Sequence, residues 1–423
     1  MKYTKKDLGS YNLHIIKTDK FKTVTVKVIF HSPIVKKEIT MRNVLSDILL
    51  QSSKNYPSKR DLIIESEELY AADLYNSTDR IGNYIMTSFT LQVLNDKYTE
   101  EGNLNKAVEF LKEILFNPDI ENNSFKEENL SLVKNNCEVA LSTIKEDPVD
   151  YTIIRLNEAY DKDSPISYRL VGYKEDLDNI NTSDLYNYYN KMIEKDYVDI
   201  FVVGDIDEKE ILTTIKANFK FRKIKKQGIP YELPIKQPRK RRLIAREKVP
   251  ASQSKLAIAC PLKKMTKYEK DYPLVLANII FGGTSDSKLF KEVREKNSLC
   301  YAIYSTLSKL DNIVVIKAGI DKENFEKTVK IITEVLHQVK KGKFTDKEIS
   351  MAKEIYNTSI ENIEENPHRI ISEYLSEEIT GLDPYKDRLE KMNNVTKKDI
   401  KKALNKINMD TIFLLEGDLK WKK

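Results

Sequence analysis

The sequence reads DIFVVGDID at Asp199–Asp207 and TIFLLEGDL at Thr411–Leu419, two apolar runs that each lead into a Gly-Asp pair. The segments before them also match, with NINTSDL at Asn179–Leu185 and NVTKKDI at Asn394–Ile400. In both copies, Thr and Asp stand where their side chains can cap the first turn of a helix that leads into the apolar strand. Because a helix, a strand and a turn recur in the same order about half a chain apart, the sequence indicates an internal duplication.

Strand patterns and helix patterns alternate within each half. Thr23–Phe30 alternates with a period of two and predicts a strand, and Tyr84–Leu94 predicts another. Apolar residues recur at helical spacing over Met41–Leu49, Leu104–Leu115 and Asn324–Val339. We therefore predict an α+β fold of two homologous domains, each a mostly antiparallel sheet covered by helices.

A basic segment separates the two halves. Between Arg222 and Lys248 there are eleven Lys or Arg residues and two Glu, whereas the whole chain carries a net charge of +6. Its closely spaced prolines disfavour helices and central strands. We expect residues 223–248 to form an extended, solvated linker, which places the domains at 1–222 and 249–423. Binding of RNA or an acidic surface is the alternative role for this charge.

The composition suits a protein in the cytoplasm. The chain of 423 residues is long enough for two domains, and 40% of its residues are hydrophobic. No run approaches the ~18 apolar residues of a membrane helix, and the first twenty residues lack the apolar core of a signal peptide. The three cysteines, Cys137, Cys260 and Cys300, are too widely spaced to imply a disulfide framework or a cysteine metal site.

One motif in the second half is specific. Phe281–Tyr301 reads FGGTSDSKLFKEVREKNSLCY, which resembles the second homologous domain of insulinase/pitrilysin-type peptidases such as the bacterial and mitochondrial processing peptidases. Ser164–Gly172 and the strand ending in Val-Val-Gly-Asp match as well. The resemblance covers nearly the whole chain and is closest to half-sized members, which pair two chains. It implies that each chain forms half of a clamshell.

Active members of that family carry His-x-x-Glu-His on a helix of the first domain. Residues at i and i+4 share one helical face, so two imidazoles meet one zinc ion, and the Glu serves as general base. The matching helix here holds Asn43, Ser46 and Asp47 at these positions. Asn is a poor zinc ligand, Ser is no general base at neutral pH, and one carboxylate does not hold zinc alone. The resemblance matches the family's distal glutamate ligand to Glu138, and our prediction does not depend on this match.

The chain offers no replacement for the missing zinc ligands. Its four histidines are His14, His31, His337 and His368, and no two of them lie within four residues of each other. There is also no phosphate-binding loop and no G-x-S-x-G nucleophile elbow. We therefore expect no bound metal, no cofactor and no peptidase activity from this chain alone.

Two residues of the motif are candidates for binding peptide. In two-chain members, the zinc-free subunit supplies an Arg and a Tyr that hold the substrate, and these match Arg294 and Tyr301. A guanidinium grips a carboxylate or carbonyl through parallel hydrogen bonds. The alternatives are a solvated helix end for Arg294 and a core position for Tyr301. Gly282 and Gly283 either let a peptide pass close to the backbone or form a tight turn.

The sequence thus predicts a zinc-free, non-catalytic subunit of a two-chain metallopeptidase. It would bind and position a peptide for a homologous partner that carries His-x-x-Glu-His. A purely structural scaffold subunit is the second hypothesis. An adaptor in a bacterial protein- or RNA-modification pathway, acting through residues 222–248, is the third.

Overall fold

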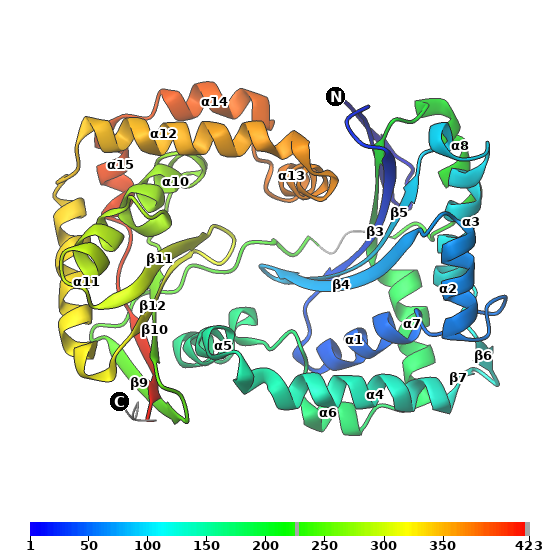
Figure 1. Ribbon diagram of the computed structural model, residues 1–423, viewed down its shortest axis with the longest axis horizontal. Coiled ribbons are helices and arrows are strands. Elements are labelled where there is room, and N and C mark those ends of the chain that lie inside the picture. The colour runs from blue at the N-terminus through cyan, green and yellow to red at the C-terminus, as the bar shows by residue number, and fades with distance from the viewer. Residues whose placement is uncertain (225–227, 419–423) are drawn as a thin grey trace. The chain divides into compact units, whose positions relative to one another are not determined.

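The structure is a computed structural model that describes residues 1–224 and 228–418 (Figure 1). It divides into two compact units that alternate along the chain. Unit 1 comprises Met1–Thr143, Arg169–Ile229 and Glu365–Ile371. Unit 2 comprises Ile144–Tyr168, Pro230–Glu364 and Ser372–Lys423, of which the last five residues lie outside the described part. Each unit contains a sheet covered by helices, so the predicted α+β class is confirmed.

Unit 1 is built on a six-stranded sheet with the order β1-β2-β8-β3-β5-β4. Its strands are β1 (Lys2–Asp7), β2 (Asn12–Lys17), β3 (Thr23–Pro33), β4 (Asp73–Ile81), β5 (Tyr84–Leu94) and β8 (Tyr197–Gly204). All neighbours are antiparallel except β2 and β8, which run parallel. The two predicted strands of this half are β5 and the first part of β3.

Unit 2 is built on a five-stranded sheet with the order β11-β12-β10-β13-β9. Its strands are β9 (Leu243–Val249), β10 (Ser254–Pro261), β11 (Cys300–Ser308), β12 (Ile313–Ile320) and β13 (Thr411–Gly417). Here β9 and β13 run parallel and the other neighbours antiparallel. Read from the opposite edge, this order repeats β2-β8-β3-β5-β4 of unit 1, including the parallel pair. The predicted internal duplication is therefore confirmed at the level of topology.

The helices are divided between the two units. Unit 1 contains α1 (Ile39–Ile48), α2 (Lys59–Glu68), α3 (Asn103–Phe116), α4 (Glu127–Ser142), α6 (Lys174–Asp178), α7 (Thr182–Lys195) and α8 (Glu208–Asn218), with the short pair β6 (Ile120–Glu121) and β7 (Ser124–Phe125). Unit 2 contains α5 (Pro148–Asp161), α9 (Lys267–Asp271), α10 (Pro273–Asn278), α11 (Phe325–Lys340), α12 (Asp346–Glu361), α14 (Tyr385–Asn393) and α15 (Lys397–Leu404). Helix α13 (Pro367–Thr380) begins in unit 1 and ends in unit 2.

The matched segments of the two halves end in capped helices, as predicted. Thr396 accepts a hydrogen bond from the backbone N–H of Asp399, and the Asp399 carboxylate accepts one from the backbone N–H of Thr396. In the first copy the cap is Asn181, one residue earlier than the Thr expected, and it accepts from the N–H of Asp184 at 2.8 Å. A side-chain oxygen satisfies a free amide of the first turn in both cases.

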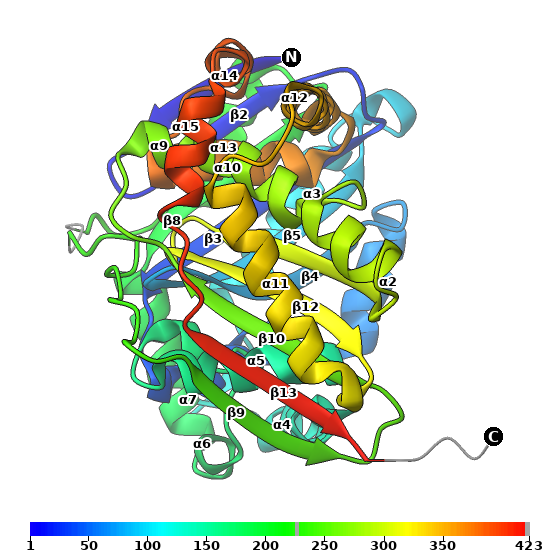
Figure 2. The ribbon, with the colours of Figure 1, turned by 90° about the vertical axis from the view of Figure 1, so that its left-hand side faces the viewer.

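Helix α5 comes from the first half of the sequence but packs in unit 2. It lies against β10 and β13, on the face of the sheet opposite α11 (Figures 1 and 2). Leu156 of α5, Ala257 of β10 and Phe413 of β13 are almost fully buried in one core cluster. Burying a leucine or phenylalanine side chain, as at Leu156 and Phe413, stabilises a fold by about 1.5–3 kcal/mol. No described helix is long and apolar enough to cross a membrane.

Candidate functional site

The helix that matches the zinc motif is α1 of unit 1. Its apolar face is intact, since Val44 and Leu45 are fully buried. Asn43 donates a hydrogen bond from Nδ2 to the carbonyl oxygen of Leu170. Ser46 donates from Oγ to the backbone oxygen of Asn43 at 2.9 Å. Both side chains therefore serve local structure and offer no base or imidazole ligand.

Asp47 is the one carboxylate among the three motif positions. Its Oδ1 accepts a hydrogen bond from Asn76 Nδ2 on β4 at 2.8 Å. Burial raises the pKa of Asp47, and the hydrogen bond from Asn76 and the charge of Lys59 only partly oppose that rise. One buried carboxyl whose pKa is raised, and which already binds an amide, does not provide the ligand set of a zinc site.

The residues of α4 do not complete a metal site either. Glu138 forms an exposed ion pair with Lys174 of α6, and the hydrogen bond from Lys174 lowers the pKa of Glu138. Its neighbour Cys137 lies near Asp47, and burial raises the pKa of that thiol to about 11, so it is neutral at physiological pH. Among the described residues, no group of three or more His, Cys, Asp and Glu side chains is arranged to hold a metal ion. The residues present therefore do not fit zinc.

The sheet of unit 1 brings together two histidines that are remote in sequence. His14 of β2 and His31 of β3 each place Nε2 3.0 Å from a different carboxylate oxygen of Asp199, which lies on β8 between them. Burial opposes ionisation of Asp199, but the hydrogen bond with His14 and the close approach of His31 outweigh it and hold the pKa of Asp199 below the usual range. Since all three residues are buried, we interpret this cluster as part of the core. Only the strand order, which the sequence does not state, could have predicted it.

The structure does bring Arg294 and Tyr301 together. Arg294 lies in η6, a π-helical turn at Phe290–Glu295, and Tyr301 lies in β11. The guanidinium carbon of Arg294 is 5.6 Å from the centre of the Tyr301 ring and 4.8 Å from that of Phe290. These distances are typical of cation–π stacking. Among the described residues, Arg294 has no carboxylate partner, so its N–H donors remain available to a ligand.

Tyr301 is turned outward by an irregularity of its strand. Strand β11 is the edge of the sheet of unit 2, and its pairing with β12 shifts between Cys300 and Ile303. Such a bulge redirects side chains, and bulges are common beside functional sites. The Tyr301 side chain is 80% exposed, which excludes the core position considered as its alternative.

A pocket of about 260 Å³ opens beside Tyr301, within unit 2. Its walls come from the start of α5 and from β10, β11 and β12: Val149, Thr152, Ile153, Gln253, Lys255, Leu256, Ala257, Tyr301, Ala302, Tyr304, Lys317, Ala318 and Gly319. This lining contains two lysines and no carboxylate. Lys255 donates to Gln253 Oε1 at 2.6 Å. The pocket is therefore apolar and aromatic with a positive potential, and the sequence did not reveal it because α5 arrives from the other half.

The two glycines of the motif differ in environment. Gly282 is buried, and a Cβ placed there would lie 2.6 Å from Ser305 Oγ and 2.7 Å from Leu289 Cδ1. Close packing thus accounts for Gly282 without a peptide. Gly283 is exposed and faces the backbone oxygen of Asn278, 3.1 Å from the position of a Cβ.

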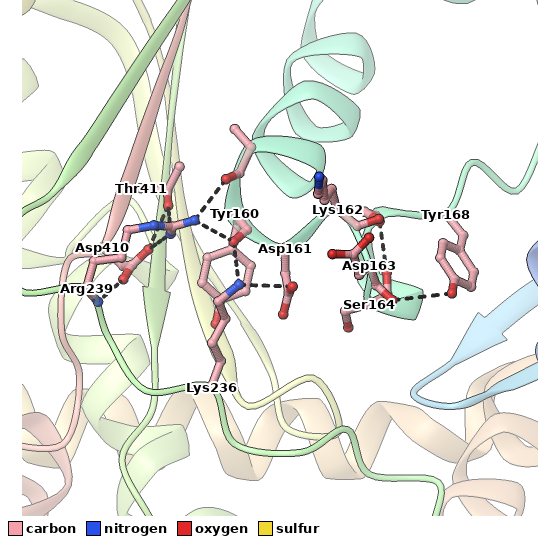
Figure 3. A network of polar contacts seen from close by, with 12 residues as sticks. Tyr160, Asp161, Lys162, Asp163, Ser164, Tyr168, Lys236, Arg239, Asp410 and Thr411 are labelled. Atoms are coloured by element: carbon pink, nitrogen blue, oxygen red, sulfur yellow. Dashed lines mark hydrogen bonds and ion pairs between the residues drawn. The ribbon is translucent and has the colours of Figure 1, made fainter.

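From Pro230 onward, the basic segment is part of a folded unit. Residues from Pro230 onward belong to unit 2, and its last part forms strand β9. Arg239 pairs with the fully buried Asp410, and its Nη2 donates to the backbone oxygens of Ala159 and Tyr160 in α5 (Figure 3). Lys225, Lys226 and Gln227 lie outside the described residues.

Lys236 adds a second attachment to α5. Its Nζ lies 2.7 Å from the backbone oxygen of Tyr160 and 3.0 Å from Asp161 Oδ1 (Figure 3). Leu233 is buried in the core beneath α5. From Pro230 onward, the segment expected to form a linker therefore packs in unit 2. The proline-rich chain is held because its side chains satisfy buried acceptors in unit 2.

Comparisons with known proteins point in one direction. Residues 179–356 match the family described as "Peptidase M16 inactive domain". The chain is 31% identical to "Probable inactive metalloprotease YmfF" of Bacillus subtilis, over 97% of this chain and 96% of that one. Among solved structures, a conserved protein from Enterococcus faecalis is similar, with a TM-score of 0.88, 30% identity and coverage of 99% and 100% of the two chains. A "peptidase M16 inactive domain" from Pseudomonas fluorescens has a TM-score of 0.80 at 18% identity, with both chains fully covered.

Proposed function

Since this chain belongs to the M16 family of insulinase-type peptidases, we propose that it is the zinc-free subunit of a two-chain metallopeptidase. The family predicted from Phe281–Tyr301 is thereby confirmed, and the chain is an inactive homologue. In this proposal the chain binds and positions an unfolded peptide. A homologous partner with an intact His-x-x-Glu-His helix then hydrolyses it.

The proposal rests on the contacts of the Arg294 guanidinium. Its guanidinium has no carboxylate partner among the described residues and stacks on the 80% exposed ring of Tyr301 at a bulged sheet edge. An arginine that only solvates a helix end does not require an aromatic ring stacked against its guanidinium. Stacking fixes the plane of the guanidinium, and a fixed guanidinium loses less entropy when it binds a carboxylate or carbonyl.

The adjoining pocket suggests which part of the peptide is bound. Val149, Ile153 and Tyr304 supply apolar and aromatic walls, and Lys255 and Lys317 supply positive charge. An apolar side chain fits such walls, and a nearby carboxylate complements the cations. We propose that Arg294 and the pocket together hold the carboxyl-terminal end of a peptide whose last residue is apolar.

Peptide binding by this chain alone tests the proposal. Fluorescence anisotropy compares labelled peptides that end in Leu or Phe, with a free or an amidated carboxyl terminus. We expect Arg294→Ala to weaken binding of the free-acid peptide by about 10- to 100-fold, the effect of losing a charge-assisted hydrogen bond. Lys296→Ala removes an equal charge from the exposed end of the same motif and should leave affinity unchanged.

Tyr301→Phe keeps the ring and removes the hydroxyl, so it separates stacking from hydrogen bonding. We expect a smaller loss than for Arg294→Ala, with Tyr268→Phe, another exposed tyrosine, as the control. Equal affinity of all four variants for the free-acid peptide would refute the site assignment. Peptide hydrolysis by the co-purified pair, lost with the partner's His-x-x-Glu-His, tests the heterodimer itself.

The scaffold hypothesis predicts a different result. A purely structural subunit would assemble with its partner and bind no peptide at any accessible concentration. We place the proposed pair in the cytoplasm, because the three cysteines are free thiols and reduced thiols persist in that compartment.

A further inference from the structure

The duplicated sheets differ at one edge. In unit 1, β1 covers the outer side of β2 in antiparallel pairing. In unit 2, β9 takes the position of β2 beside its parallel partner β13, and no described strand covers its outer side. Figure 2 shows β9 at this border of the sheet. An uncovered edge is a template for another strand.

Exposure of the two equivalent strands differs accordingly. In β2, Leu13 and Ile15 are almost fully buried. In β9, Leu243 is 37% exposed and Ile244 is 49% exposed. Aliphatic side chains on an open edge favour association, and monomeric proteins usually protect such edges.

The backbone of β9 has free hydrogen-bonding positions on that side. The N–H of Leu243 donates to Asp410, and the carbonyl of Val249 accepts from Asp418, so both residues face β13. The backbone N–H and C=O groups of successive residues point to opposite sides of a strand. The backbone groups of Ile244, Arg246 and Lys248 therefore point away from the sheet.

The exposed charged side chains of β9 and of the two residues before it are basic. Arg241, Arg242, Arg246 and Lys248 are exposed along it. Arg246 is held in place by the ring of Phe325, 4.5 Å away, and by Glu326 at 3.3 Å. The one acidic residue of β9, Glu247, points to the other face, where it accepts from Tyr151 and Arg155 of α5.

We propose that β9 is a docking strand for an acidic, extended segment of another protein, which pairs antiparallel with it as β1 pairs with β2. The basic side chains along β9 favour an acidic partner segment. The β1 segment of a second copy reads KYTKKD and would repel the basic edge. Nucleic acid fits less well, because the edge presents aliphatic side chains and strand hydrogen bonds and, among the described residues, no exposed ring for base stacking.

The test uses a fluorescein-labelled peptide of alternating Glu and Val, blocked at both ends so that it offers no terminal carboxylate to Arg294. We expect it to bind the full chain with a Kd below about 1 mM, more weakly as salt is raised. Hydrogen exchange should slow within residues 243–249. The same peptide with Lys in place of Glu should not bind.

Two variants localise the binding. Ile244→Pro removes an outward N–H without breaking the ladder to β13, and Lys248→Glu reverses an edge charge; each should weaken binding at least tenfold. Lys347→Glu makes the same charge change on α12 and serves as the control. The proposal is overturned if the acidic peptide fails to bind, if the variants bind it equally, or if protection appears elsewhere. Tighter binding of single-stranded RNA, or self-association lost in Ile244→Pro, would also overturn it.

Discussion

Replacing Arg239 with alanine tests whether the basic segment is part of unit 2 or a solvated linker. Asp410 is fully buried, and Arg239 is its only charged partner among the described residues. Arg239→Ala leaves this carboxylate without a counter-charge. It also removes two hydrogen bonds to the backbone of α5.

The expected cost follows from these contacts. Removing one partner of a buried ion pair destabilises a protein by about 3–5 kcal/mol. Two donors to Asp410 remain, the backbone N–H of Arg239 at 2.6 Å and the hydroxyl of Thr411 at 2.7 Å. The Arg239 side chain is 32% exposed, so water screens part of the charge. We therefore expect a loss of about 2–3 kcal/mol, which lowers Tm by about 4–12 °C for a unit of this size.

Thermal and urea unfolding of three variants measure this. Arg241→Ala, at an exposed neighbouring position, should change stability by less than about 0.5 kcal/mol. Adding Asp410→Asn to Arg239→Ala removes the unpaired charge and should restore part of the loss, since an unpaired buried charge is the main penalty. The stabilising role of Arg239 is refuted if Arg239→Ala unfolds like Arg241→Ala, or if the double variant is less stable than the single one. In either case the contact of Arg239 with Asp410 does not stabilise unit 2.

Three further predictions concern stability and reactivity. Burial and the nearby Glu373 raise the pKa of Glu377 to about 7, so stability falls as pH rises from about 4.5 to 7; Glu377→Gln should remove this fall and stabilise the protein at pH 8 by up to about 3 kcal/mol in urea unfolding. Gly282→Ala forces a Cβ against Ser305 and should cost about 1–3 kcal/mol in thermal unfolding, more than the same change at the exposed next glycine. Burial raises the pKa of Cys260 to about 12, so mass spectrometry should find this thiol unmodified by iodoacetamide at pH 8 until urea unfolds the chain.

The elements of this fold that the sequence predicted are those with a local pattern. Tyr84–Leu94 forms β5 with the predicted limits. The helix predicted at Leu104–Leu115 lies within α3, and the one predicted at Asn324–Val339 starts one residue before α11. The duplication followed from a repeated helix and strand, which carry their own caps and apolar periods. The boundaries at residues 222 and 249 stay a prediction, because repeated halves and compact units differ where α5 crosses from one half into unit 2.

The features that escaped prediction depend on which segments meet in space. The pocket beside Tyr301 needs α5 to pack on the sheet of the other half, and the pairing of His14 with His31 through Asp199 needs the strand order β2-β8-β3. The bulge that exposes Tyr301 is a one-residue shift in pairing, and the letters LCYAIY do not distinguish it from a regular strand. Sequence periodicity reports which side of a strand faces a core, and it does not report the register of its neighbour.

The structure also constrains how the rival roles of the basic segment can be separated. Neutralising Arg239–Arg242 together would remove the ion pair between Arg239 and Asp410. Any loss of RNA or partner binding could then follow from unfolding of unit 2. Arg241 and Arg242 are exposed, and Arg242 donates a hydrogen bond to Thr333 Oγ1 at 3.0 Å. Changing these two residues alone therefore tests the role of the positive charge in binding while the Arg239–Asp410 pair stays in place. The features suited to binding, Arg294 with Tyr301 and the edge of β9, all lie in unit 2, whereas the motif helix of unit 1 offers no zinc ligand set. Under the proposed function, these surfaces of unit 2 would act together with a partner chain that supplies the zinc.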